Sequence, residues 1–135
     1  MCIVQDPLTT RSGVVGPGTD RTDIYRRGRK IILSIDGRHT NEAARQTTGY
    51  LVALVNEIKG PIEFVADLRK ITGFSAESRI CWQETFKKVQ DRINLITVVQ
   101  GTALAKMSAA AIGLYAGIKV RYVDTLDQAL QLTTV

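Results

Sequence analysis

Apolar and polar residues alternate along the stretch TDIYRRGRKIILSID, residues 22–36. Ile31, Leu33 and Ile35 recur with a period of two, which is typical of a half-buried strand. Gly28 interrupts the pattern, and glycine supplies the positive φ that a tight hairpin often needs. The alternation predicts two antiparallel strands joined by a turn near Gly28. Asp36, followed by glycine, is expected to end the second strand.

The pattern then changes to the three- and four-residue steps of a helix. Thr40 is the expected N-cap, and Gly60 is the expected left-handed residue beyond the last turn. Pro61 prevents the helix from continuing. The predicted apolar face consists of Ala44, Thr48, Leu51, Leu54, Val55 and Ile58.

Strand-like and helix-like patterns alternate along the rest of the chain. Apolar runs predict strands at 62–68, 95–100 and 118–125, and a continuous run such as LITVVQ is typical of a strand covered on both faces. Helices are predicted between these strands and after the last one. Their apolar faces consist of Trp82, Phe86, Val89 and Ile93, then of Leu104, Met107, Ala111 and Leu114, and finally of Leu126, Ala129 and Leu130.

This order of elements predicts an α/β fold. Strands separated by helices run parallel and are joined by right-handed crossovers, while the N-terminal hairpin adds an antiparallel edge. We therefore expect a mixed, mainly parallel sheet with about four helices, forming a single domain over 22–135. Residues 1–21, rich in Gly, Pro, Thr and Ser, are predicted to be a flexible arm, with a short edge strand possible at 2–4.

Composition narrows the class of protein. Hydrophobic residues make up 44% of the 135-residue chain and charged residues 23%, as in ordinary globular domains. No run of eighteen apolar residues and no secretory signal pattern is present. The two cysteines, Cys2 and Cys81, are too few for a disulfide framework and do not form a CxxC zinc motif. These features predict a cytoplasmic protein.

The net charge of +5 is concentrated near the N-terminus. Seven basic residues lie between Arg11 and Arg38, against three aspartates. They form either a solvated hairpin face or a surface that attracts lipid headgroups, nucleic acid or an acidic partner. Tyr25 is the only aromatic residue in the stretch, so sequence-specific nucleic-acid binding is not expected.

Residues that carry chemistry are scarce. His39 is the only histidine and is interpreted as a surface or capping residue. Asp36, Asp67 and Asp124 each lie at the C-terminal end of a predicted strand, where α/β proteins bind ligands, but dispersed aspartates do not predict a metal site. No phosphate-binding glycine motif occurs. We expect no catalytic residues, no metal and no cofactor, and hence no enzyme.

The start of the third predicted helix has two interpretations, plain helix capping and anion binding. Gly101 and Thr102 open the third helix, and a glycine-containing helix N-terminus can hold an anion. The basic hairpin residues Arg26, Arg27 and Arg29 complete this candidate set.

Three segments carry a resemblance to a known family. They are FVADLRKITGFSAESRICWQ, LITVVQGTALAKM and GIKVRYVDTLDQAL. Together with the order of elements, they resemble the STAS-like, SpoIIAA-like family of small bacterial domains over about residues 23–132. The resemblance implies the family's mixed sheet and a non-enzymatic regulatory or protein-interaction module.

The resemblance also implies specific sites. Related anti-sigma factor antagonists are phosphorylated on a serine at a helix N-terminus, within a motif that reads roughly Asp-Leu-Ser and then Asp-Ser-Ser-Gly. Asp67 and Leu68 match its start, but residues 72–75 are Thr-Gly-Phe-Ser, so only Ser75, with Thr72 behind it, is carried over as a phospho-switch candidate. The expected partner surface is Asp67, Arg69, Lys70, Phe74, Glu77 and Arg79.

Two partner hypotheses follow, and a third concerns self-association. Another protein is the first expected partner, and a lipid or membrane surface is the alternative. Small residues such as Ala105 and Ala109–Ala111 either pack tightly on the sheet or leave room for a ligand beside it. A homo-oligomer is expected through exposed edge strands.

Overall fold

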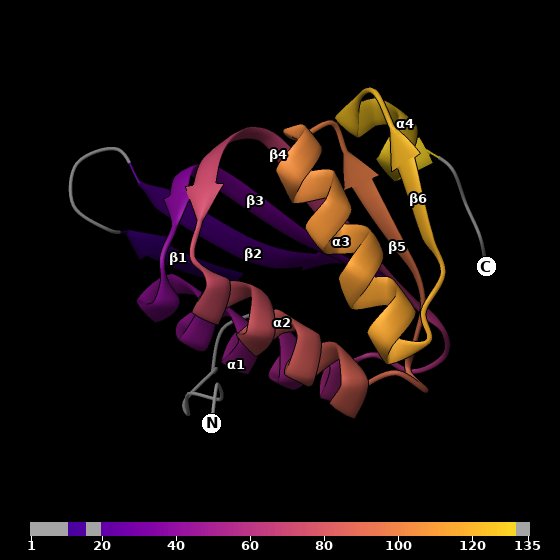
Figure 1. Ribbon diagram of the computed structural model, residues 1–135. Helices are drawn as coiled ribbons and strands as arrows, with labels where there is room; N and C mark the ends of the chain where they lie inside the picture. Colours follow the sequence, from indigo (N-terminus) through magenta and orange to yellow (C-terminus); the bar gives the residue numbers. More distant parts are fainter. Residues whose placement is uncertain (1–10, 16–19, 132–135) are drawn as a thin grey trace.

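A computed structural model describes residues 11–15 and 20–131 of the chain, which contain one six-stranded sheet (Figure 1). The strands lie side by side in their order along the chain. The first three are antiparallel and the remaining pairs are parallel, and the β2–β3 hairpin and the parallel pairs are as predicted. Their bounds are β1 Arg11–Val15, β2 Arg21–Arg27, β3 Lys30–His39, β4 Ile62–Phe74, β5 Ile93–Val99 and β6 Val120–Val123.

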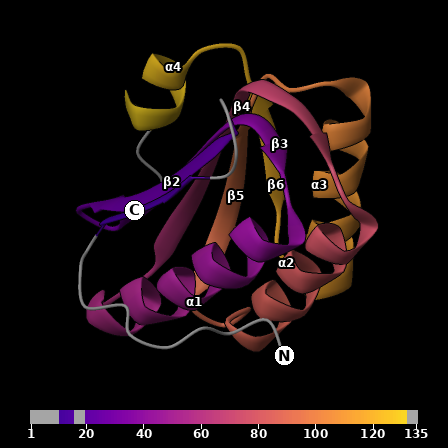
Figure 2. The same cartoon turned by 90° about the vertical axis from the view of Figure 1, so that its left-hand side faces the viewer.

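Three helices cover one face of the sheet, and a fourth lies against the other (Figure 2). Helices α1 (Asn41–Glu57), α2 (Ala76–Lys88) and α3 (Ala103–Ala116) share the main hydrophobic core. Helix α4 (Leu126–Gln131) packs on the opposite face, over a smaller cluster. The predicted α/β class, with its N-terminal hairpin and four helices, is confirmed.

Capping residues set the start of each of the three long helices. Thr40, Ser75 and Thr102 adopt extended backbone conformations, and each side-chain oxygen accepts a hydrogen bond from the backbone N–H three residues later. These bonds satisfy groups that have no partner within the helix. Gly117 ends α3 in the left-handed conformation, with φ of 75°.

Strands β3 and β4 are longer than the apolar pattern predicts. They continue to His39 and Phe74, beyond the predicted ends at residues 36 and 68. Two register shifts in the β3–β4 ladder accommodate the extension. Gly37 lies at one shift with φ of 88°, and Asp20 packs against it and accepts a hydrogen bond from the backbone N–H of Arg38.

The N-terminal boundary also differs. Arg11–Val15, which belong to the predicted arm, form β1 and pair with β2. A strand therefore occupies part of the segment assigned to the arm. The edge strand predicted at residues 2–4 lies outside the described residues.

The predicted apolar face of α3 does not face the core. Leu104, Met107 and Leu114 are 62%, 67% and 87% exposed. Small residues face the sheet instead, with Ala105 and Gly113 among them. A Cβ atom on Gly113 would lie 2.3 Å from Val120 Cγ2, so α3 approaches β6 too closely for larger side chains.

The second face of the sheet carries a buried ion cluster beside the α4 contact. Glu63 Oε1 pairs with Lys30 Nζ at 2.5 Å. Glu63 Oε2 accepts a hydrogen bond from Thr97 Oγ1 at 2.5 Å and pairs with Arg121 at 3.0 Å. A buried carboxylate needs such compensation, because desolvation penalises its charge. The cluster joins β3, β4, β5 and β6.

One finding bears on the predicted location. Within the described residues, none of the helices has the length and apolar character that crossing a bilayer requires. The cytoplasmic location stays a prediction.

Candidate functional site

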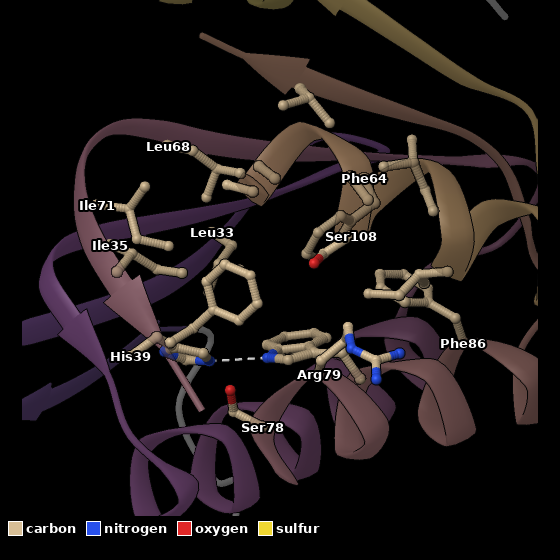
Figure 3. Close-up of a pocket in the computed structure, with 18 residues that line it drawn as sticks. Leu33, Ile35, His39, Phe64, Leu68, Ile71, Ser78, Arg79, Phe86 and Ser108 are labelled. Atoms are coloured by element: carbon tan, nitrogen blue, oxygen red, sulfur yellow. Dashed lines mark hydrogen bonds between the residues drawn. The ribbon is translucent and has the colours of Figure 1, made fainter. Parts of the chain in front are cut away.

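An apolar cavity of about 90 Å³ lies between the sheet and helices α2 and α3 (Figure 3). The extension of β4 beyond β5 forms one wall, because β4 pairs with β5 only as far as Asp67. Its apolar residues there, Leu68, Ile71 and Phe74, line the cavity. Phe64 and Trp82 line it from the core side, with ring centroids 5.7 Å apart.

His39 and Ser78 are the buried polar residues in the cavity wall, and His39 is the titratable one. Trp82 Nε1–H donates a hydrogen bond to His39 Nε2 at 2.8 Å, so the neutral ring carries its proton on Nδ1. That N–H then donates to Thr22 Oγ1 at 3.1 Å. Burial lowers the pKa of His39 to about 4. With both nitrogens in hydrogen bonds, the ring is a structural anchor for α2, and the predicted surface position is wrong.

Half-buried residues mark the open side of the cavity. They come from the end of β4, from α2 and from α3, and they are Phe74, Arg79, Ser108, Ala109 and Ile112. Arg79 is the charged residue of the lining, because His39 is neutral. Its guanidinium lies 3.4 Å from Gln83 Oε1. The cavity therefore combines apolar walls with one cation at its edge.

Ser75 joins the N-termini of two helices. Its hydroxyl donates to Asn41 Oδ1 in α1 and accepts a hydrogen bond from the backbone N–H of Ser78 at 3.0 Å. Arg38 and Arg45 line a polar depression beside it. Ser75 is half-buried, and Thr72 is exposed on β4. The predicted N-cap role of Ser75 is confirmed, whereas its phosphorylation stays a prediction.

The predicted partner surface divides between the two sides of the sheet. Asp67 and Arg69 form two hydrogen bonds of 2.8 and 2.7 Å and, with Lys70, line a charged depression. Phe74 and Arg79 line the apolar cavity instead. Glu77 is exposed in the first turn of α2. These six residues do not form one continuous patch.

The predicted anion-binding residues are also separated. Gly101 and Thr102 follow the C-terminal end of β5, whereas Arg26, Arg27 and Arg29 lie at the β2–β3 turn, beside the start of β4. Arg26 is already paired with Glu57 at 3.4 Å. Parallel pairing of β3, β4 and β5 places the two groups at opposite ends of the sheet.

The acidic and histidine side chains do not converge either. Asp36 and Asp67 line the charged depression, while His39 lines the apolar cavity. No group of three metal-binding side chains occurs among the residues that the structure describes.

The small residues of α3 were one signal of the cavity, because Ala105 and Ala109 line it, but the sequence pattern missed the wall that β4 forms and the His39–Trp82 bond. Ile71 and Phe74 were the available signal, since they continue the apolar face of β4 beyond Leu68. Lys70 and Gly73 interrupt that signal and made the segment resemble a loop.

Comparisons with known proteins identify the fold. No protein-family model and no curated protein matches the chain. A solved structure from Shewanella loihica PV-4 does match, and it is described as an uncharacterized protein of the DUF3478 family with a SpoIIAA-like fold. The two chains are 14% identical, with a TM-score of 0.64, over 87% of this chain and 95% of the other. This chain has a SpoIIAA-like fold, as its resemblance implied.

Proposed function

We propose that this SpoIIAA-like domain is a non-enzymatic binding module that holds an apolar group in the cavity beneath α2 and α3. The apolar cavity with Arg79 at its edge is the observation that carries the proposal. Ligand sites are typically concave and mostly apolar, with a few polar groups that fix orientation.

The size and charge of the cavity define the ligand class. About 90 Å³ corresponds to roughly three water molecules, so the enclosed space accepts only the end of a chain. The open side lets the rest of a longer ligand extend past Arg79. A linear chain with an anionic head, such as a fatty carboxylate, satisfies both the walls and the guanidinium.

Trp82 provides the test, because it is the only tryptophan and it lines the cavity. We expect titration with monomeric dodecanoate to change Trp82 fluorescence in a saturable way. Ala109→Phe, which fills the cavity, is expected to weaken binding at least tenfold. Ala110→Phe is the matched control, because Ala110 is exposed on the outer side of α3.

A second pair of measurements tests the charge. Arg79→Gln is expected to remove the preference for dodecanoate over dodecanol while leaving dodecanol affinity within about twofold. Absence of a saturable signal, or equal loss in both phenylalanine variants, would refute the cavity as the binding site.

The Ser75 junction supports a second candidate, a phosphorylation-controlled interaction module. A phosphate on Ser75 would replace the hydroxyl proton donated to Asn41 and add nearly two negative charges next to Arg38 and Arg45. Such a change would remove the hydrogen bond that joins α2 to Asn41 of α1 and would place the phosphate beside the two arginines. Mass spectrometry of the protein isolated from its native cells tests this candidate, and persistent absence of phosphate on Ser75 and Thr72 would remove it.

A further inference from the structure

The outer side of α3 is an exposed apolar face. It consists of four strongly exposed large residues together with exposed alanines: Leu104, Met107, Leu114, Tyr115, Ala103, Ala110 and Ala111. The residues recur at three- and four-residue steps along the whole 14-residue helix. Hydrophobic residues scattered singly over a surface need no explanation, but a contiguous face of this kind marks an interaction site.

The charged residues of α3 and of the chain segments that adjoin it are all basic. No acidic residue occurs between Asp91 and Asp124, a segment that includes all of α3. Lys106 lies on the side of the helix next to β6, since Tyr122 donates a hydrogen bond to its carbonyl. Lys87 of α2 borders the opposite side, with its Nζ 5.5 Å from the Tyr115 ring centroid. Lys119 is exposed just beyond the helix.

We propose that α3 docks the domain on an anionic lipid surface, with the helix lying in the plane of the interface. Leu104, Met107 and Leu114 would enter the headgroup–acyl boundary. The bordering lysines would contact lipid phosphates. This combination of a large apolar face and a basic border is the pattern of interfacial helices.

A second copy of the chain fits the same face less well. Two such faces in contact would bring lysine borders of like charge together, which disfavours self-association. One face of a 14-residue helix measures about 21 Å by 10 Å, or roughly 200 Å². A stable protein–protein interface buries about 800 Å² on each partner.

Docking does not depend on the proposed ligand cavity, although the two share a helix. Ala105 and Ala109 line the cavity from the inner side of α3, while the docking residues lie on its outer side. A variant that fills the cavity should therefore still bind vesicles. Failure of one proposal can thus be told apart from failure of the other.

Co-sedimentation with vesicles tests the proposal on the full chain. We expect binding to vesicles that contain 30% phosphatidylglycerol and at least tenfold weaker binding to pure phosphatidylcholine. Raising NaCl from 50 to 500 mM should weaken binding at least tenfold, because salt screens the lysine contacts. The double variant Leu104→Gln/Leu114→Gln should bind at least tenfold more weakly, and its exposed positions make a folding defect unexpected.

Charge variants locate the surface. Lys106→Gln is expected to reduce binding to anionic vesicles about fivefold, the effect of one lysine near such a surface. Arg27→Gln, which removes one charge from the exposed β2–β3 turn, is the matched control and should change binding less than twofold. The cavity-filling Ala109→Phe should also remain within twofold of wild type.

Three results would overturn the proposal. The first is no binding to anionic vesicles at 50 mM NaCl. The second is loss of binding in Arg27→Gln with retention in Lys106→Gln, which would move the contact to the basic hairpin. The third is a dimer in analytical ultracentrifugation that Leu104→Gln/Leu114→Gln dissociates, without vesicle binding by the wild type, which would assign the face to a second copy.

Discussion

Helices α2 and α3 lie on the same face of the sheet and are both apolar along one side, but they bury opposite kinds of residue. Helix α2 places Trp82 and Phe86 in the core, where Phe86 meets the ring of Phe64 edge-on at 4.9 Å. Helix α3 places Ala105 and Gly113 toward the sheet and leaves its large residues outside.

The spacing between each helix and the sheet explains the difference. Large side chains hold α2 away from the sheet and fill the gap that they create. At Gly113, α3 is so close to Val120 that a single methyl group does not fit without movement. An apolar stripe therefore predicts a helix, but the size of the residues on the opposite side decides which face is buried.

Truncation of one large residue in each helix is the strongest test of this contrast. Phe86→Ala should lower the free energy of unfolding by about 3–5 kcal/mol, because it removes a buried ring and leaves a cavity. Leu114→Ala, at an 87% exposed position, should change it by less than about 0.5 kcal/mol. Urea denaturation measures both, and a large loss in Leu114→Ala would show that the outer α3 face is covered in the protein as studied.

Acid should weaken the attachment of α2 in particular, because His39 anchors Trp82. The folded-state pKa of about 4 lies below the unfolded value of about 6.5. The neutral ring therefore makes its full contribution to the free energy of unfolding above pH 6.5, and this contribution is lost as the pH falls toward 4. The expected loss is about 3 kcal/mol at pH 4.

Chemical denaturation between pH 4 and 7.5, followed by Trp82 fluorescence, measures this loss. His39→Gln removes the titrating group, so the difference between the two pH profiles isolates its effect from that of the carboxylates. Parallel profiles for wild type and His39→Gln would contradict the buried neutral histidine.

A further, smaller loss of stability is expected on the inner side of α3, where the sign of the effect is informative. Replacing glycine by alanine within a helix usually stabilises it by about 0.5–1 kcal/mol. Gly113→Ala should instead destabilise the protein by about 1–3 kcal/mol, because its methyl group would meet Val120 and the carbonyl of Ile118.

Ala110→Gly on the exposed side provides the comparison for Gly113→Ala. Ala110→Gly should lower the free energy of unfolding by about 1 kcal/mol, because glycine has a lower helix propensity than alanine. Thermal unfolding of both variants measures the two effects. A Gly113→Ala protein more stable than wild type would mean that α3 can move away from the sheet at little cost.

Residue patterns within each segment predicted the helices and strands well. The candidate site depends instead on contacts between segments that are far apart in the chain. Ser75 was identified as a cap from its type and position, because capping depends on the adjacent N–H groups. The inward side of α3 depends on its contact with β6, which no local pattern contains. His39 was misplaced for the same reason, since its two partners lie 17 and 43 residues away in the chain.

The order of the strands has a consequence for how the protein is made. Every strand of the sheet lies next to the strand that precedes it in the chain. During synthesis, β2 therefore finds β1 already available, and each parallel strand arrives after the helix that connects it to its neighbour. N-terminal segments emerge first from the ribosome. The sheet can consequently grow in the direction of translation, and no strand between β1 and β6 has to remain unpaired while it waits for a distant partner.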